Sequence, residues 1–256
     1  MGIVDTPNDF GHLGGVPSHP ELLDWLAVEF RDGEQSLKQL HRLMVTSETY
    51  RQTSRTSELD PAVAATASAL DSDNRLLWRM NRLRLDSECI HDAVLAATGR
   101  LDLRMGGPSD RQFGLSPGVH VTPVVDYAVF DVNSDLARRR SVYRFLFRTL
   151  PDPLMDALDC PSGDQITPAR INSVTVQQAL ALWNSGFILQ NAEHLAARLS
   201  REAEDIEEQV ELGVRLAFGR EATETERLQL SEYARKYGLA NMCRLLFNAN
   251  EFVFVD

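Results

Sequence analysis

The chain has 256 residues, which is enough for one large domain or two small ones. Hydrophobic residues make up 43% and charged residues 25%, a globular composition that excludes a largely disordered chain. The formal net charge of -11 at pH 7 repels nucleic-acid backbones and anionic membranes, so neither is an expected partner. No apolar run reaches the ~18 residues that a membrane-spanning helix needs.

The first residues show no signal-peptide pattern, so the sequence indicates either a cytoplasmic protein or a chain that lacks its native N-terminus. The three cysteines, Cys89, Cys160 and Cys243, are widely spaced. They predict neither a disulfide framework nor a zinc half-site or haem-attachment motif, and therefore no cofactor in this chain. Cys89 and Cys243 stand among apolar residues, so both are predicted to be buried.

Helices are predicted for most of the first hundred residues, after an ordered loop over residues 1–17. Ser18 and Glu21 form a predicted capping box that begins a buried helix extending to about Arg31. A second helix is predicted over 37–44, then a linker over 47–58. The Asp60-Pro61 pair opens a third helix, and a fourth covers residues 87–98.

Residues 99–135 differ from the rest, because Gly and Pro interrupt them repeatedly and β-branched residues alternate between these breaks. This pattern predicts a short β-hairpin insertion around residues 119–130. Helices are predicted again afterwards, over residues 138–150, 174–183, 191–202, 206–218, 224–237 and 240–248. The predicted fold is therefore mostly α: a single domain over residues 1–256, built as an irregular helical array with one β-hairpin.

Arginines cluster in two segments that are candidate anion-binding sites, the first with Arg79, Arg82 and Arg84 and the second with Arg140, Arg144 and Arg148. In a helix, the second set lies at i, i+4 and i+8 and forms one stripe. Guanidinium groups bind sulfate and carboxylate in a bidentate manner. The alternative is an internal ion-pair network with Asp86, Glu88 and Asp135.

The loop-rich N-terminal segment holds a candidate metal site formed by Asp9, His12 and His19. The six histidines of the chain show no i, i+4 pair and no HExxH motif. Capping, loop hydrogen bonds and packing are the alternative roles for these side chains.

No residue is predicted to be catalytic. Gly114 to Gly118 matches the GxSxG pattern, but a nucleophile elbow uses the N–H of the residue after the serine, and Pro117 has none. The segment beyond is strand-like, whereas the elbow needs a helix. Asp126 and Asp131 flank the β segment and are the carboxylates considered for glycoside-type chemistry.

Several segments of the sequence resemble domain-of-unknown-function family 1553, the C-terminal domain of planctomycete-type secreted proteins. They include GIVDTPNDFG at residues 2–11, PSHPELLDWL at 17–26, NRLLWR at 74–79, RRSVY at 139–143 and NANEF at 248–252. The resemblance implies an extracytoplasmic location, a parent protein with a c-type cytochrome module and a further domain, and a setting of sulfated-polysaccharide breakdown. Because such a location is oxidising, a disulfide between one pair of the three cysteines remains an alternative.

The sequence as a whole favours a structural or binding module of a multi-domain extracytoplasmic protein. Its expected partners are other domains of the parent protein and an anionic glycan, which would bind at the arginines and the hairpin. The alternative is a hydrolase that acts on polysaccharide with carboxylates or a His/Asp site. A third hypothesis is a redox partner of a cytochrome domain.

Overall fold

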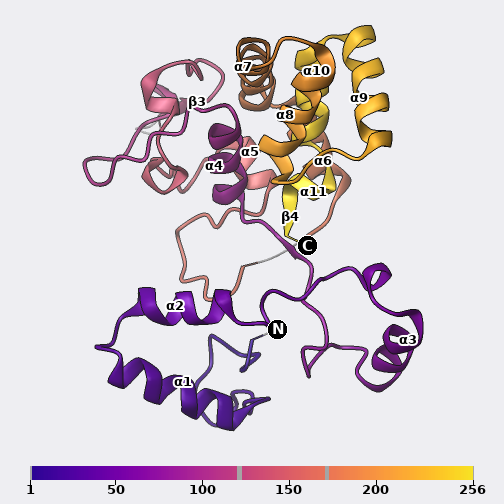
Figure 1. The fold of residues 1–256 in the computed structure, drawn as a ribbon. Helices are drawn as coiled ribbons and strands as arrows, with labels where there is room; N and C mark the ends of the chain where they lie inside the picture. Colours follow the sequence, from indigo (N-terminus) through magenta and orange to yellow (C-terminus); the bar gives the residue numbers. More distant parts are fainter. Residues whose placement is uncertain (1, 120–122, 171–172, 256) are drawn as a thin grey trace. The chain divides into compact units, whose positions relative to one another are not determined.

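The computed structural model describes residues 2–119, 123–170 and 173–255 (Figure 1). Internal contacts divide the chain into two compact units, which are called here the N-terminal unit and the C-terminal unit. The N-terminal unit contains residues 2–83 and Val255, and the C-terminal unit contains the described part of residues 84–254. That residues 1–256 fold as a single domain stays a prediction.

The N-terminal unit consists of short helices joined by loops: α1 (Pro20–Asp32), α2 (Leu37–Thr46), the 3-10 helix η1 (Thr56–Glu58) and α3 (Pro61–Leu70). Ser36 caps α2 by accepting the N–H of Gln39, and proline occupies the first turn of α1 and α3. The capping box predicted at Ser18 is wrong. His19 precedes α1, and the Ser18 hydroxyl instead donates to the carbonyl of Ile3.

The C-terminal unit holds most of the helices: α4 (Ser87–Ala97), α5 (Pro153–Ala157), α6 (Val176–Asn184), α7 (Gly186–Glu202), α8 (Ile206–Phe218), α9 (Glu224–Tyr237), α10 (Leu239–Phe247) and α11 (Asn250–Val253). Complete capping boxes begin α6, at Thr175 and Gln178, and α9, at Thr223 and Glu226. Gly219, with φ of 73°, ends α8 in the left-handed conformation that glycine adopts without strain.

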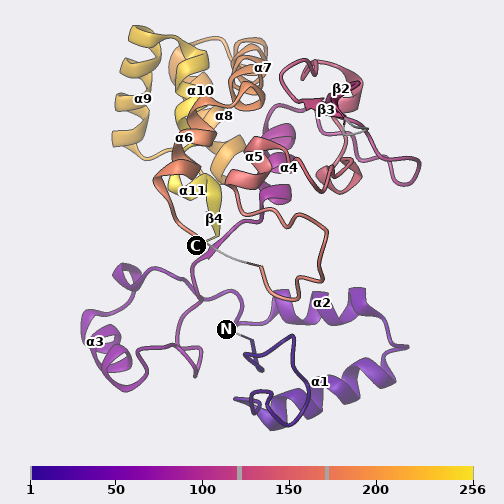
Figure 2. The same cartoon turned by 180° about the vertical axis from the view of Figure 1, so that it is seen from behind.

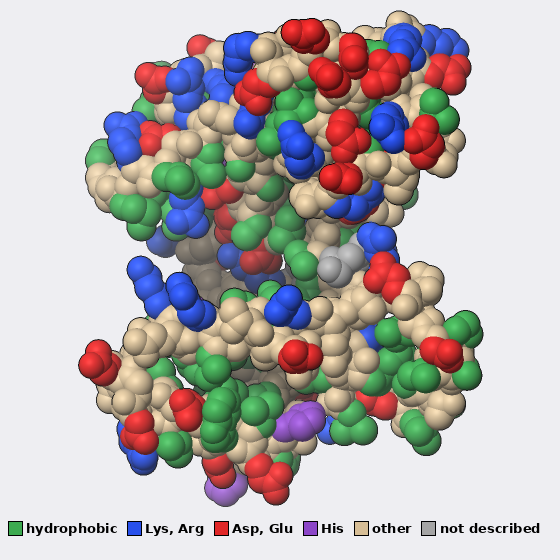
Figure 3. Space-filling model, in the orientation of Figure 1, with side chains coloured by type: hydrophobic (Ala, Val, Ile, Leu, Met, Phe, Trp, Pro, Cys, Tyr) green, Lys and Arg blue, Asp and Glu red, His purple; other side chains and the backbone are tan. Residues whose placement is uncertain are grey.

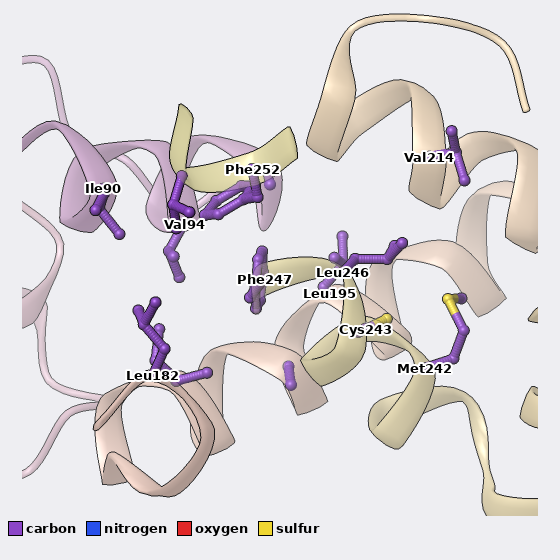
Figure 4. Close-up of a cluster of buried hydrophobic side chains, with 14 of the residues drawn as sticks. Ile90, Val94, Leu182, Leu195, Val214, Met242, Cys243, Leu246, Phe247 and Phe252 are labelled. Atoms are coloured by element: carbon purple, nitrogen blue, oxygen red, sulfur yellow. The ribbon is translucent and has the colours of Figure 1, made fainter. Parts of the chain in front are cut away.

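The core of this unit lies where α7, α8 and α10 meet (Figure 4). Leu195, Val214 and Phe247 are completely buried there. Gly213 allows α8 to approach closely, because a Cβ at this position would lie only 3.2 Å from the Leu199 side chain. Cys243 is buried as predicted, but Cys89 is exposed, since it lies on the face of α4 opposite the buried residues.

The β structure is small. β2 (Gly114–Ser116) pairs antiparallel with β3 (Val124–Asp126), and Figure 2 shows both strands. β1 (Leu83–Arg84) and β4 (Phe254–Val255) form a second two-stranded sheet. The mostly α fold with a short hairpin is therefore confirmed, although the first strand begins before the predicted position. Residues 120–122 of the predicted hairpin lie outside the described residues.

The helix predicted over residues 138–150 is wrong. The 3-10 helix η3 (Asp135–Ala137) ends before this segment, in which the only helical element among the described residues is the 3-10 turn η4 (Ser141–Tyr143). Its backbone bonds instead to the segment 99–135, called here the insertion loop. The carbonyl of Tyr143 accepts from the N–H of Asp110, and the N–H of Phe145 donates back to the Asp110 carbonyl. These tertiary hydrogen bonds replace the i to i−4 bonds that a helix would make.

We predict that Leu195→Ala destabilises the C-terminal unit by about 3 kcal/mol, because it leaves a cavity at a completely buried site. Leu228→Ala is the matched control, since Leu228 lies on α9 and is 64% exposed. Chemical denaturation followed by circular dichroism measures both. Equal losses in the two variants would contradict the placement of the core.

Candidate functional site

The arginines predicted to form a helical stripe lie on irregular chain, and two of the three are paired internally. The Nε atom of Arg140 is 3.4 Å from an Asp92 carboxylate oxygen. Arg144 donates to Asp152 at 2.8 Å and to Gln112 at 2.7 Å. Arg148 is exposed. The structure therefore does not bring these three guanidinium groups together on one helix face.

The first arginine cluster is also dispersed. Arg84 is buried, and its guanidinium donates to the Asp159 carboxylate at 2.7 Å and to the Leu158 carbonyl at 3.1 Å. Arg79 donates to the Met80 carbonyl and lies over the ring of Trp78. Arg82 has an exposed side chain. Arg84 therefore serves the interior, Arg79 is half-buried, and Arg82 is exposed.

The carboxylate of Asp159 gathers four donors. Besides Arg84, it accepts from the Ser173 N–H, the Ser173 hydroxyl and the Gln178 amide. Burial by itself would raise the pKa of Asp159, but the Ser173 hydrogen bonds and the Arg84 charge outweigh it and hold the pKa below its usual value. The Asp159 carboxylate, which follows α5, therefore links this end of α5 to α6 and to Arg84.

Two of the three residues proposed as metal ligands, Asp9 and His19, form local hydrogen bonds. An Asp9 oxygen accepts the N–H of Gly11 at 2.9 Å, and His19 bonds to the Ser18 hydroxyl through Nδ1. His12 is exposed. Across the described parts of the chain, no three His, Cys, Asp or Glu side chains are grouped so that they could hold a metal ion.

The carboxylates considered for glycoside chemistry stabilise their own turns. Asp126 accepts the N–H of Ala128, and Asp131 accepts the N–H of Asn133. Gly114 to Ser116 of the GxSxG pattern form β2, which pairs with β3 instead of leading into an elbow and helix. These segments therefore show hydrogen bonds that explain their polar residues without catalysis.

Sequence analysis gave no role to His91, which is 4% exposed on α4. Its ring stacks on Phe187 with centroids 4.4 Å apart, and Nδ1 lies 3.2 Å from an Asp92 oxygen. Burial, the largest effect, lowers the pKa of His91, so the ring is neutral near pH 7. Its position beside Ile90 and Val94 on the apolar face of α4 was the available signal for a packing role.

The N-terminal unit holds a large apolar hollow, called here the apolar groove. Its volume is about 830 Å³, and it is lined by α1, α2 and residues 74–83. On the face shown in Figure 3, hydrophobic side chains gather between α1 and α2. The prediction that α1 is a buried helix is wrong, since none of its residues is buried and Leu23 and Trp25 are 38% and 48% exposed.

The charges that line the groove are of one sign. Arg75, Arg79 and His19 are its basic lining residues, and no Asp or Glu is found among the described residues that line it. This is unusual in a chain with 37 acidic and 26 basic residues. The groove therefore combines an apolar wall with a cationic edge.

The loop of residues 71–81 contributes Asn74, Arg75, Leu77 and residues 79–81 to the lining. Asp71 accepts the N–H groups of Arg75 and Leu76, and buried Asn74 binds the Arg79 carbonyl and the Asn81 side chain. Within this loop Leu77 has φ of 55°, which is rare for a residue with a branched side chain, and it lines the groove. Leu77 thus adopts a strained backbone conformation at a position where its apolar side chain lines the groove.

No helix in the described part of the chain is long and apolar enough to cross a membrane.

The chain is thus a mostly helical module whose N-terminal unit exposes an apolar groove. The sequence matches the family described as protein of unknown function (DUF1553) over residues 1–234, and the chain belongs to that family. No curated protein and no solved structure matches it. The family resemblance of the sequence is thereby confirmed.

We predict that Asp159→Asn destabilises the C-terminal unit by about 3 kcal/mol, because buried Arg84 loses its counter-charge. Asparagine tolerates the left-handed backbone at this position, where φ is 60°, so the variant removes the charge without adding backbone strain. Asp156→Asn, at an exposed position of α5, is the control. Thermal and urea unfolding at pH 7 provide the measurement.

The same pair of variants tests pH dependence. Because the folded pKa of Asp159 is lowered, the unfolded chain binds more protons between the two pKa values. This contribution to stability is present above the unfolded pKa of about 3.9 and is lost as the pH falls through the folded pKa. Asp159→Asn should lose less stability on acidification than the unchanged protein, and an equal loss would contradict the assignment.

Proposed function

We propose that this chain is a non-catalytic binding module of a larger protein and that it engages a partner polypeptide through the apolar groove. The observation that carries the proposal is the exposure of the apolar faces of α1 and α2 around an 830 Å³ hollow. A solvent-exposed apolar surface of this extent on a folded protein is typical of an interaction site. A neighbouring domain of the parent protein is the expected partner, in an extracytoplasmic setting that the family resemblance supports.

The helices themselves support this proposal. α1 and α2 have 13 and 10 residues, and isolated helices of this length are marginally stable in water. They contact each other, yet neither has a buried residue. Leu40 and Leu43 of α2 and Leu26 of α1 line the same hollow and lack a core to fill. A partner that covers the groove would supply the missing apolar contacts.

Binding of an anionic glycan is a second candidate, and Arg148 supports it because its side chain is exposed. It has less support than the groove, since Arg84, Arg140 and Arg144 are engaged by Asp159, Asp92 and Asp152. The hydrolase alternative has the least support, because Asp126 and Asp131 already bind their own turns.

We predict that Leu43→Asp lowers the affinity of the chain for the fluorescent dye anilinonaphthalene sulfonate by about ten-fold, because it places an unpaired carboxylate on the apolar wall. Val63→Asp is the matched control: Val63 is 59% exposed on α3 and does not line the groove. Fluorescence titration gives both affinities. A dye that binds both variants alike does not occupy the groove.

Hydrogen exchange tests the partner directly. We predict that amides of α1 and α2 exchange at least ten-fold more slowly in the longer parent protein than in this chain, because a covering partner suppresses local opening. Amides of α7, with five buried residues, serve as the internal reference and should change little. Unchanged exchange in α1 and α2 would count against a polypeptide partner within the parent protein.

A further inference from the structure

We infer that the occupant of the apolar groove is an amphipathic α-helix that carries carboxylates beside its apolar face. This inference rests on the proposed function and specifies the partner's secondary structure and charge. It depends on three observations: the length of the apolar lining, the sign of the charges at its edge, and the loop of residues 71–81 that contributes to the lining.

The length of the groove fits a helix. On α1 the apolar lining extends from Leu22 to Phe30, which are eight residues apart. At 1.5 Å per residue this distance is ~12 Å, slightly more than two helical turns. A partner helix with apolar residues at i, i+4 and i+7 presents a stripe of nearly the same length, ~10 Å. α2 contributes a second set of apolar lining residues, Leu40, Leu43 and Met44.

The packing partners also fit a helix. α1 and α2 contact each other and leave one apolar face open. A third helix laid between them buries the side chains of both, as in a helix-in-groove complex. An extended strand would leave its backbone N–H and C=O groups facing leucine and methionine side chains, and such unpaired groups are costly to bury.

The charge of the partner follows from the cations at the edge. Arg75 and Arg79 both line the groove. No described carboxylate of the lining balances them. A glutamate or aspartate next to the apolar stripe of the partner would pair with these guanidinium groups, whereas a lysine would be repelled.

The loop of residues 71–81 holds this arrangement before binding. Asn74 is 1% exposed, and its side-chain amide donates to the Arg79 carbonyl and to the Asn81 side chain, which follow the turn that contains Arg75 and Leu77. Leu77 is thereby fixed in its left-handed conformation on the wall of the groove. A fixed wall lowers the ordering cost of association, which favours binding of a helix in one orientation.

Two synthetic peptides of about 16 residues test the inference, each with leucines at i, i+4 and i+7 on an alanine and glutamine background. One carries glutamates beside the leucine stripe, and the other carries lysines at the same positions. Fluorescence anisotropy with the full chain measures affinity, and circular dichroism measures helix formation. We expect the glutamate peptide to become helical on binding and to bind about ten-fold more tightly than the lysine peptide.

Variants of the chain assign the effect to the groove. Leu43→Asp should abolish binding of both peptides. Arg75→Gln should reduce the preference for glutamate by about three-fold, the size expected of a partly exposed ion pair. Arg42→Gln is its control, because Arg42 lies on α2 and does not line the groove. Equal effects of the two arginine substitutions would overturn the assignment of the cationic edge.

The outcomes separate this inference from the proposed function. If Leu43→Asp weakens dye binding but neither peptide binds, the groove remains a binding surface and the helical occupant is wrong. Equal affinity for both peptides overturns the charge of the partner. Palmitate serves as a third probe: if it binds while both peptides fail, the groove takes a small amphipathic acid instead of a polypeptide. If dye, peptides and palmitate all bind Leu43→Asp as well as the unchanged chain, both proposals fail.

Discussion

The contact between α7 and α10 is the interaction on which the C-terminal unit depends. Leu195 and Leu199 on α7 meet Met242, Leu246 and Phe247 on α10, and the exposed fraction of each of these side chains is 2% or less. The remaining helices pack around this pair. α8 joins it through a glycine that leaves room for neighbouring leucines, and α4 adds its own apolar face. Because this contact is dry and closely packed, the unit provides a rigid body on which less regular chain can be held.

The insertion loop and the segment after it depend on that body in a different way. Their structure is stabilised by side chains that reach across the sequence, such as Arg84 to Asp159 and Arg139 to the carbonyls of Gly106 and Pro108. Arginine suits this purpose because one planar group satisfies several acceptors at once. The arginine richness that first indicates an anion-binding surface is thus largely used to fasten loops. The apolar groove differs from these arginines. Its hydrophobic side chains are exposed and are not packed into a core.

Sequence reasoning succeeded where the cause of the structure is local. The capping box at Thr223 and Glu226 was predictable because every atom involved lies within one turn. Residues 138–150 have helical spacing but no helix, because their backbone bonds to a loop some thirty residues earlier, and periodicity cannot detect such a competitor. For the same reason the Arg84–Asp159 pair, 75 residues apart, was not predictable. The helix that lines the groove was predicted to be buried in a core, because its apolar stripe indicates a covered surface. The stripe does not identify what covers that surface.

The groove has a consequence for the protein in solution. Two copies could bury their grooves against each other, and the opposing influence is electrostatic, because every copy carries a formal charge of -11. That repulsion acts over a Debye length of about 8 Å at physiological ionic strength and of about 3 Å at 1 M salt. The hydrophobic attraction is not screened in this way. The net negative charge therefore opposes association of two copies through their apolar grooves. Raising the salt concentration screens this repulsion and leaves the hydrophobic attraction in place.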